Sequence, residues 1–217
     1  MSNLTANDTA LDIQINRFGF WCAVICIATG LLSAALPLDV QGGYDATPAE
    51  RLSWLEAHRG LFIAGWLNQI VAMLTLSGLF LAITWRVRLK SPLSALLAAG
   101  ATALATMAFV IPKFMAVWTI PLLAKATLSG TAGSEMAAML LPLLNVSIPF
   151  SLYTSFDYMG FWLYSLFALL VMVPMVDRDW LSKFAALSLG LFGVGFYVAF
   201  AVLIFVVIGA PDVALSL

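Results

Sequence analysis

Charged residues are scarce in this sequence. They make up 10% of its 217 residues, whereas a soluble domain carries about 25%. Hydrophobic residues reach 63%, and the mean hydropathy is +1.02. So small a share of polar side chains is too little to cover a folded core with a surface that water would solvate. The composition therefore predicts an integral membrane protein, with the lipid bilayer as the partner of its apolar surface.

The few charges also lack an excess of either sign. Ten basic and 11 acidic side chains give a net charge of −1. A protein that binds the phosphates of nucleic acid needs clustered lysine and arginine residues, and this chain has no such stripe. We therefore expect no nucleic-acid partner.

Histidine is nearly absent, which limits the chemistry that the chain can perform by itself. His58 is the one histidine. A single histidine excludes from this chain the HExxH zinc site and haem held by two histidines. The sequence also contains no P-loop, no GxGxxG motif and no Gly-x-Ser-x-Gly elbow. We therefore expect no catalytic residues, no cofactor and no metal, and a protein that is not an enzyme.

Cysteine is limited to two residues, Cys22 and Cys26, inside an apolar run. On a helix this spacing points both side chains along one stripe. That is poor geometry for a disulfide. We interpret the two thiols as small packing residues, with a metal-binding or redox-sensing pair as the alternative.

What the sequence does contain is a series of long apolar runs. A helix needs about 20 apolar residues, at about 1.5 Å each, to cross the hydrocarbon layer. We therefore predict an all-α fold, a polytopic bundle of about five transmembrane helices within one transmembrane domain over residues 17–217. The predicted spans are residues 18–38, 61–85, 93–111, 152–176 and 184–208.

Two polar segments flank the first predicted span. Residues 1–16 carry no lysine or arginine, and we expect them to form a flexible cytoplasmic tail. Residues 39–59 are the most polar stretch of the chain. There Thr47, Pro48 and Glu50 have the spacing of a capping box, which predicts the start of a short helix resting at the membrane interface.

Residues 112–151 do not fit a simple span. Their apolar runs are broken by charged residues and by prolines, and none reaches about 18 uncharged residues. We expect broken, interfacial or re-entrant helices in this segment. The alternative is a sixth span over residues 136–151. The prolines are Pro112, Pro121, Pro142 and Pro149.

The distribution of basic residues favours five spans over six. Loops rich in lysine and arginine stay in the cytoplasm. With five spans and a cytoplasmic N-terminus, six basic residues face the cytoplasm and four face outside, and a sixth span would reverse this count. We therefore expect a multi-pass protein of a bacterial inner (plasma) membrane with its N-terminus inside. The inner set is Arg17, Arg86, Arg88, Lys90, Arg178 and Lys183, and the outer set is Arg51, Arg59, Lys113 and Lys125.

Asp157 is the first candidate for a functional residue, because it lies near the start of a predicted span. An ionisable side chain inside the membrane is costly and is a functional candidate by default. At the interface, however, a carboxylate near a helix N-terminus stays solvated. Lys113 lies at about the same depth, so the two could pair. Such a pair would be either a structural anchor or a relay for protons or ions.

Three further polar residues are candidates. Asn68 and Gln69 lie about 11 Å into the second predicted span, where they either bond across the bundle or line a cavity. His58 lies at the outer end of the same span. It could titrate, bind a metal together with Asp45 and Glu56, or simply sit at the interface.

The stretch His58-Arg59-Gly60-Leu61-Phe62-Ile63-Ala64-Gly65-Trp66-Leu67, together with Trp54, carries a resemblance. It resembles a family of uncharacterised bacterial multi-pass membrane proteins classed as a domain of unknown function. The similarity covers residues 54–85, with an echo around 153–176. It implies a bacterial origin and about six spans, and it supplies no activity and no functional residues.

Three functions agree with these observations. The first is a non-enzymatic component, either an accessory or structural subunit packed against other membrane protein subunits or a small homo-oligomer. The second is a small-molecule or ion transporter or channel with a site near Asp157 and Asn68. The third is an intramembrane enzyme that acts on a lipid or quinone, with Asp157, Lys113 or His58 as acid or base.

Overall fold

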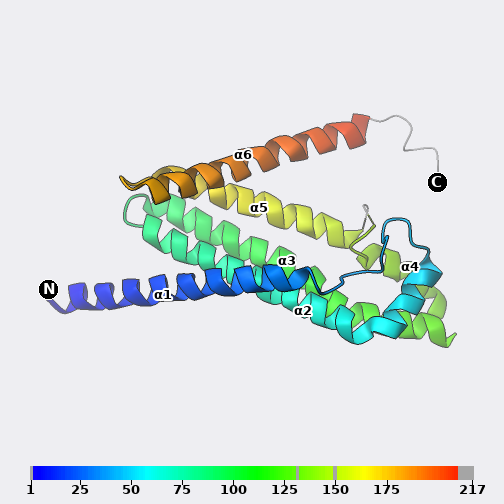
Figure 1. The fold of residues 1–217 in the computed structure, drawn as a ribbon. Helices are drawn as coiled ribbons and strands as arrows, with labels where there is room; N and C mark the ends of the chain where they lie inside the picture. Colours follow the sequence, from blue (N-terminus) through cyan, green and yellow to red (C-terminus); the bar gives the residue numbers. More distant parts are fainter. Residues whose placement is uncertain (1, 131, 149–150, 210–217) are drawn as a thin grey trace. The chain divides into compact units, whose positions relative to one another are not determined.

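The computed structural model describes residues 2–130, 132–148 and 151–209, and within this part of the chain all regular structure is helical. Five of the six helices, all except α4, are long and apolar enough to cross a membrane. The predicted all-α, multi-pass bundle with five spans is therefore confirmed. In chain order the helices are α1 (Ser2–Ser33), α2 (Pro48–Val87), α3 (Pro92–Ser129), α4 (Ser134–Leu144), α5 (Leu152–Met175) and α6 (Trp180–Gly209) (Figure 1).

The described residues between α3 and α5 hold no helix long enough for a sixth span. Helix α4 has 11 residues, which is about half the length needed to cross the hydrocarbon layer. The described part of residues 136–151 therefore does not form the alternative span, and the count of about six that the family resemblance implies stays a prediction. The interfacial or re-entrant position of α4 stays a prediction, and Pro149 lies outside the described residues.

Helix α3 is longer than predicted. It does not end at Ile111 but continues through Pro112 and Pro121 to Ser129. The predicted break at Pro112 is therefore wrong. In an apolar environment a full break would leave several backbone groups without partners, whereas a proline within a helix frees only the carbonyl of the preceding turn.

The first two helices also extend beyond the predicted bounds. Helix α1 includes residues 2–16, so the segment expected to be a tail is helical, while its flexibility and cytoplasmic location stay predictions. In α2, the predicted surface helix and the second span are continuous, with a kink at His58, where φ is −119° and ψ is 20°. The capping box is confirmed, because the Thr47 N–H donates to Glu50 Oε2 at 2.7 Å and the Glu50 N–H donates to Thr47 Oγ1 at 3.3 Å.

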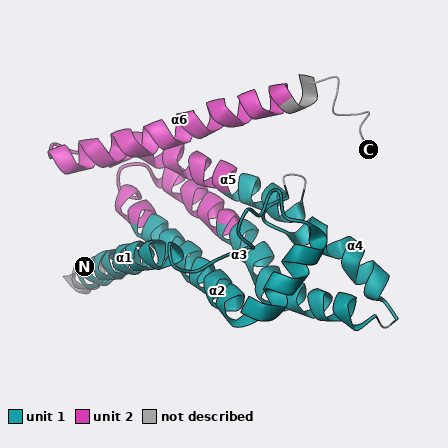
Figure 2. Cartoon of the chain, turned by 45° about the vertical axis from the view of Figure 1, so that its right-hand side comes forward, with its two compact units in different colours: residues 1–82, 106–160 teal, residues 83–105, 161–217 magenta. Residues whose placement is uncertain are grey.

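Contacts divide the chain into two compact units (Figure 2). The first comprises residues 1–82 and 106–160, and the second residues 83–105 and 161–217. The predicted single transmembrane domain stays a prediction.

Close packing of α1 on α2 is a main feature of the first unit. A Cβ atom added at Gly78 would lie 2.6 Å from Cys22 Sγ, and one added at Gly19 would lie 2.6 Å from Ala82 Cβ. Both cysteines are free thiols, and Cys22 is buried against Gly78. Cys22 therefore acts as the small packing residue that its position in an apolar run predicts.

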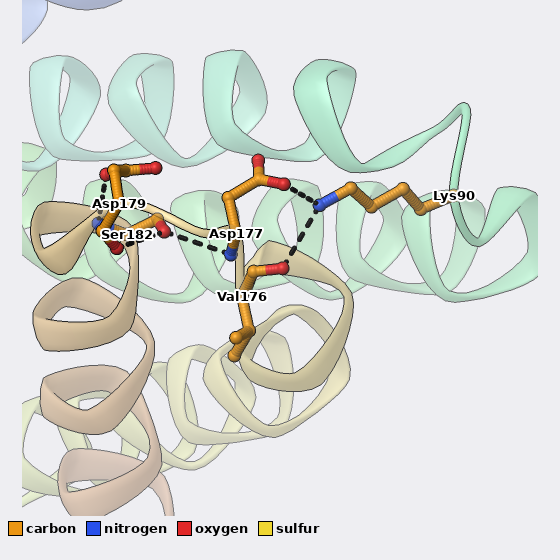
Figure 3. A network of polar contacts seen from close by, with 5 residues as sticks. All are labelled: Lys90, Val176, Asp177, Asp179 and Ser182. Carbon is orange, nitrogen blue, oxygen red and sulfur yellow. Dashed lines mark hydrogen bonds and ion pairs between the residues drawn. The ribbon is translucent and has the colours of Figure 1, made fainter.

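The second unit joins the α2–α3 loop to the turn between α5 and α6 (Figure 3). Lys90 Nζ donates to Asp177 Oδ1 at 2.9 Å and to the Val176 carbonyl at 3.2 Å. The Ser182 N–H donates to Asp179 Oδ2 at 2.8 Å, which caps the start of α6 and lowers the pKa of the Asp179 carboxyl. The α2–α3 loop and the α5–α6 turn therefore lie at the same end of this unit. This is the expected arrangement if the chain crosses the membrane along α3 and returns along α5.

Candidate functional site

The structure brings Lys113 of α3 and Asp157 of α5 together. Lys113 Nζ lies 3.0 Å from Asp157 Oδ1, so the predicted pairing is confirmed. The Lys113 side chain is 5% exposed and the Asp157 side chain 28%. The lysine is therefore the enclosed partner, and the carboxylate lies nearer to the surface of the unit.

Aromatic rings surround this pair. Tyr153 lies one helical turn before Asp157, and its hydroxyl is near enough to interact with the Asp157 carboxylate. Lys113 Nζ also lies 4.9 Å from the centroid of the Phe109 ring and 5.2 Å from that of Tyr153. The faces of aromatic rings attract cations. A carboxylate and two rings therefore replace the water that the ammonium group loses on burial.

Helix α2 adds a row of aromatic side chains that leads to the same tyrosine. Ring centroids lie 6.3 Å apart for Trp54 and Phe62, 6.1 Å for Phe62 and Trp66, and 5.1 Å for Trp66 and Tyr153. Trp66 and Tyr153 belong to the buried core of the unit, against which the partly buried Leu141 of α4 also packs. The row was not predicted above, although the recurrence of aromatic rings at every fourth position from 54 to 66 is a helical spacing that indicates it.

The amides of Asn68 and Gln69 bond across the bundle to α1. Asn68 Nδ2 donates to the Thr29 carbonyl and to Ser33 Oγ, both at 2.9 Å, and Gln69 Nε2 donates to Ser33 Oγ at 3.0 Å. Ser33 Oγ in turn donates to the Thr29 carbonyl at 2.8 Å. Asn68 therefore ties α2 to α1, as the first of the two expectations for it predicts.

His58 lies at the kink of α2 and is exposed. Its Nδ1 lies 3.0 Å from the Trp54 carbonyl, which can only accept, so Nδ1 carries the proton. Its ring stacks on Trp54 with centroids 5.2 Å apart. Across the described residues, no group of three or more His, Cys, Asp or Glu side chains could hold a metal, so Asp45, Glu56 and His58 do not form the metal site considered above.

A cavity of about 380 Å³ opens beside this aromatic row. Its walls come from the segment before α2, the first part of α2, α3, α4 and the segment after α4. It could not be predicted from the sequence, because no local pattern places these segments together. Its apolar lining includes Leu38, Leu52, Leu55, Phe62, Trp66, Ile120 and Leu141, and its polar lining includes Asp39, Arg51, Asn145 and Ser147.

Charged and polar side chains are fixed at one part of this cavity. Arg51 Nη1 lies 3.3 Å from Asp39 Oδ2, and both side chains are mostly buried. Ser147 Oγ donates to the same Asp39 oxygen at 2.6 Å, and Arg51 Nε donates to the Ala46 carbonyl at 3.4 Å. The arginine and the aspartate therefore neutralise each other, and contacts from three segments hold them in place.

Two donor atoms of cavity-lining residues lack hydrogen-bond partners among the described residues, and both atoms are enclosed by protein rather than open to the cavity. They are the indole Nε1 of Trp66, a residue that is 1% exposed, and Arg51 Nη1. Arg51 Nη1 lies close enough to Asp39 for an ion pair without making an aligned hydrogen bond. A buried donor without a partner costs about 1–3 kcal/mol.

Neither Asp157 nor Asn68 lines this cavity. A second hollow, of about 410 Å³, lies between Arg59 and Glu56 of α2 and Lys125 of α3.

Comparison of the chain with protein-family models, with curated proteins and with solved structures finds no match. The resemblance of residues 54–85 to a bacterial membrane family therefore stays a prediction.

Proposed function

We propose that this protein is a non-enzymatic component of a membrane assembly, either an accessory or structural subunit or a small homo-oligomer. The observation that carries this proposal is the use of the polar side chains at membrane depth. Lys113 is held by Asp157 and two aromatic rings, and Asn68 is held by α1. Such contacts are what a bundle uses to hold its helices together.

The outer surface of the bundle supports the same proposal. In the most apolar window of α6, only 11% of the residues are buried within the chain, and in α1 the share is 17%. Faces of this kind contact either lipid or another membrane protein. On α6 the exposed apolar side chains include Leu187, Leu191, Val194 and Val198.

Site-specific photocrosslinking in native membranes tests this proposal. A photoreactive residue in place of Leu191, which is 67% exposed on α6, should form one discrete crosslink to a protein. The same residue in place of Leu89, which is exposed in the loop after α2, is the control and should not form that crosslink. If positions on both α1 and α6 crosslink only to lipid, the subunit proposal is wrong.

The proposed location is a bacterial inner membrane with the N-terminus in the cytoplasm. The observation in its favour is the contact between Lys90 and Asp177, which gathers two basic connections at one end of the second unit. Basic loops stay in the cytoplasm. The basic residues there are Arg86, Arg88, Lys90, Arg178 and Lys183.

A small-molecule or ion transporter is the second candidate. The buried pair of Lys113 and Asp157 favours it, because paired ionisable groups at membrane depth are typical of proton and ion pathways. Uptake into lipid vesicles that contain the purified protein tests it. Asp157→Asn should abolish uptake if the pair is a relay, whereas the control Asp177→Asn at the exposed ion pair should not.

A further inference from the structure

The hollow between α2 and α3, of about 410 Å³, has an apolar floor and a charged rim. Leu55 and Ala124 of the floor are buried, at 8% and 4% exposure. The rim consists of Glu56 and Arg59 of α2 and Lys125 of α3, and all three side chains are exposed. A molecule in the hollow can therefore reach the charged groups.

The two basic side chains of this rim have no acidic partner. The ion pairs within the described residues, such as that of Lys113 with Asp157, involve other basic side chains. Neither Arg59 nor Lys125 forms a pair with a described carboxylate, although Glu56 lies on the same rim. Two positive charges and one negative charge face the hollow, which leaves one positive charge in excess.

The position of the hollow along α2 matches the headgroup region of a bilayer. Glu56 and Arg59 precede the apolar stretch of α2 that begins at Leu61. The polar headgroups border the hydrocarbon core, so the start of such a stretch is where a helix passes from one to the other. Because Lys125 lines the same hollow, it belongs at the same level.

The charges and donors of the rim define the group that would complete it. A guanidinium and an ammonium group can only donate hydrogen bonds, so their ligand must be an anion with acceptor oxygens. A phosphodiester carries one negative charge, which balances the excess charge of the rim. Arginine binds phosphate oxygens through two parallel N–H groups, and lysine binds them as a point charge.

From these observations we infer that the hollow binds the headgroup of an anionic phospholipid, with the phosphodiester between Arg59 and Lys125 and the start of the acyl chains against the apolar floor. Basic pockets between transmembrane helices bind anionic lipid headgroups. The proposed function assigns no ligand, so this site is additional to it and does not depend on it.

Native mass spectrometry of the purified full-length protein tests the site. The protein is delipidated in a neutral detergent and titrated with dioleoyl phosphatidylglycerol, and the fraction with one bound lipid gives the affinity. Dioleoylglycerol, which has the same chains and no phosphate, is the reference ligand. We expect it to bind about tenfold more weakly. Equal affinity for the two lipids would overturn the proposal.

A matched pair of double variants locates the phosphate. Arg59→Gln with Lys125→Gln removes both positive charges of the rim and should weaken phosphatidylglycerol binding about tenfold. The control, Arg178→Gln with Lys183→Gln, removes two exposed positive charges outside the hollow and should leave the affinity unchanged. An equal loss in both double variants would mean general attraction between the lipid and basic side chains, and the proposed site would be wrong.

Two further measurements separate binding from a structural role. Because Arg59 and Lys125 are exposed and unpaired, their lipid-free double variant should keep the thermal midpoint of the wild type. Added phosphatidylglycerol should then raise the midpoint of the wild type more than that of the variant. Glu56→Gln removes the negative charge of the rim and should tighten binding about twofold. Weaker binding in Glu56→Gln would show that the phosphate does not lie among these charges.

The headgroup without its acyl chains distinguishes a lipid from a free phosphodiester. Glycerophosphoglycerol lacks the apolar chains that would cover the floor of the hollow. At equal concentration it should therefore not displace phosphatidylglycerol from the protein. Displacement at equal concentration would mean that the hollow takes a free phosphodiester, and the lipid proposal would be wrong.

Discussion

Lys113 Nζ and Asp157 Oδ1 lie 3.0 Å apart between α3 and α5, with the lysine almost completely enclosed. Helix α3 reaches this point only because it continues through Pro112. The pair therefore depends on the part of α3 that extends beyond its predicted end.

Removing one member of this pair should destabilise the protein strongly. Asp157→Asn leaves a buried ammonium group without its counter-charge, which costs about 3 kcal/mol. The charge-free double variant Lys113→Met, Asp157→Leu should recover much of that loss. Unfolding in detergent, analysed as a double-mutant cycle, measures both effects.

Asp177→Asn is the control, because its partner Lys90 belongs to an exposed pair and the expected loss is below about 1 kcal/mol. Equal losses at the two aspartates would contradict the structural role of the buried pair.

The hydrogen bonds of Asn68 should stabilise the contact between α1 and α2. Asn68→Ala removes two donors to α1 and leaves the buried Thr29 carbonyl with one partner fewer, so we expect a loss of about 1–2 kcal/mol. Gln69→Ala, which removes one bond to Ser33, should cost less. Thermal unfolding of the two variants gives the comparison, and a larger loss at Gln69 would be inconsistent with this geometry.

The close approach of Gly78 to Cys22 predicts a clash and its relief. Gly78→Ala places a Cβ atom 2.6 Å from Cys22 Sγ and 3.0 Å from Phe18 Cζ, so these side chains or α1 itself must shift, at a cost of about 1–3 kcal/mol. Adding Cys22→Ala removes the sulfur and should restore much of the stability. Gly100→Ala on α3, where a Cβ would meet no atom within 4 Å, should be neutral or stabilising. Thermal unfolding compares these variants, and a fully stable Gly78→Ala protein would show that the two helices are farther apart.

The proposed orientation can be tested with two cysteines at equally exposed positions. Tyr44 precedes α2 and Leu89 follows it, and each is 78% exposed. In a background with Cys22 and Cys26 replaced by alanine, a membrane-impermeant maleimide added to spheroplasts should label Tyr44→Cys and not Leu89→Cys. The opposite pattern would place the N-terminus outside.

The number of spans could be predicted because each long apolar run exceeds the thickness of the hydrocarbon layer. The pairing of Lys113 with Asp157 could be predicted as well, since both were placed at one membrane depth. The continuation of α3 through Pro112 could not be predicted, because the rule that proline ends a helix neglects the cost of unpaired backbone groups in an apolar medium. The cavity could not be predicted either, because Asp39, Trp66 and Ser147 come together only through tertiary contacts.

The native mass of the protein, extracted with its lipids in polymer-bounded particles and analysed by mass spectrometry, tests the proposed assembly most directly. One chain has a mass of 23.3 kDa. We expect a larger protein mass, either a multiple of this value or one chain with a stoichiometric partner. A protein mass of a single chain in every preparation would contradict the proposed assembly and would favour a monomeric transporter.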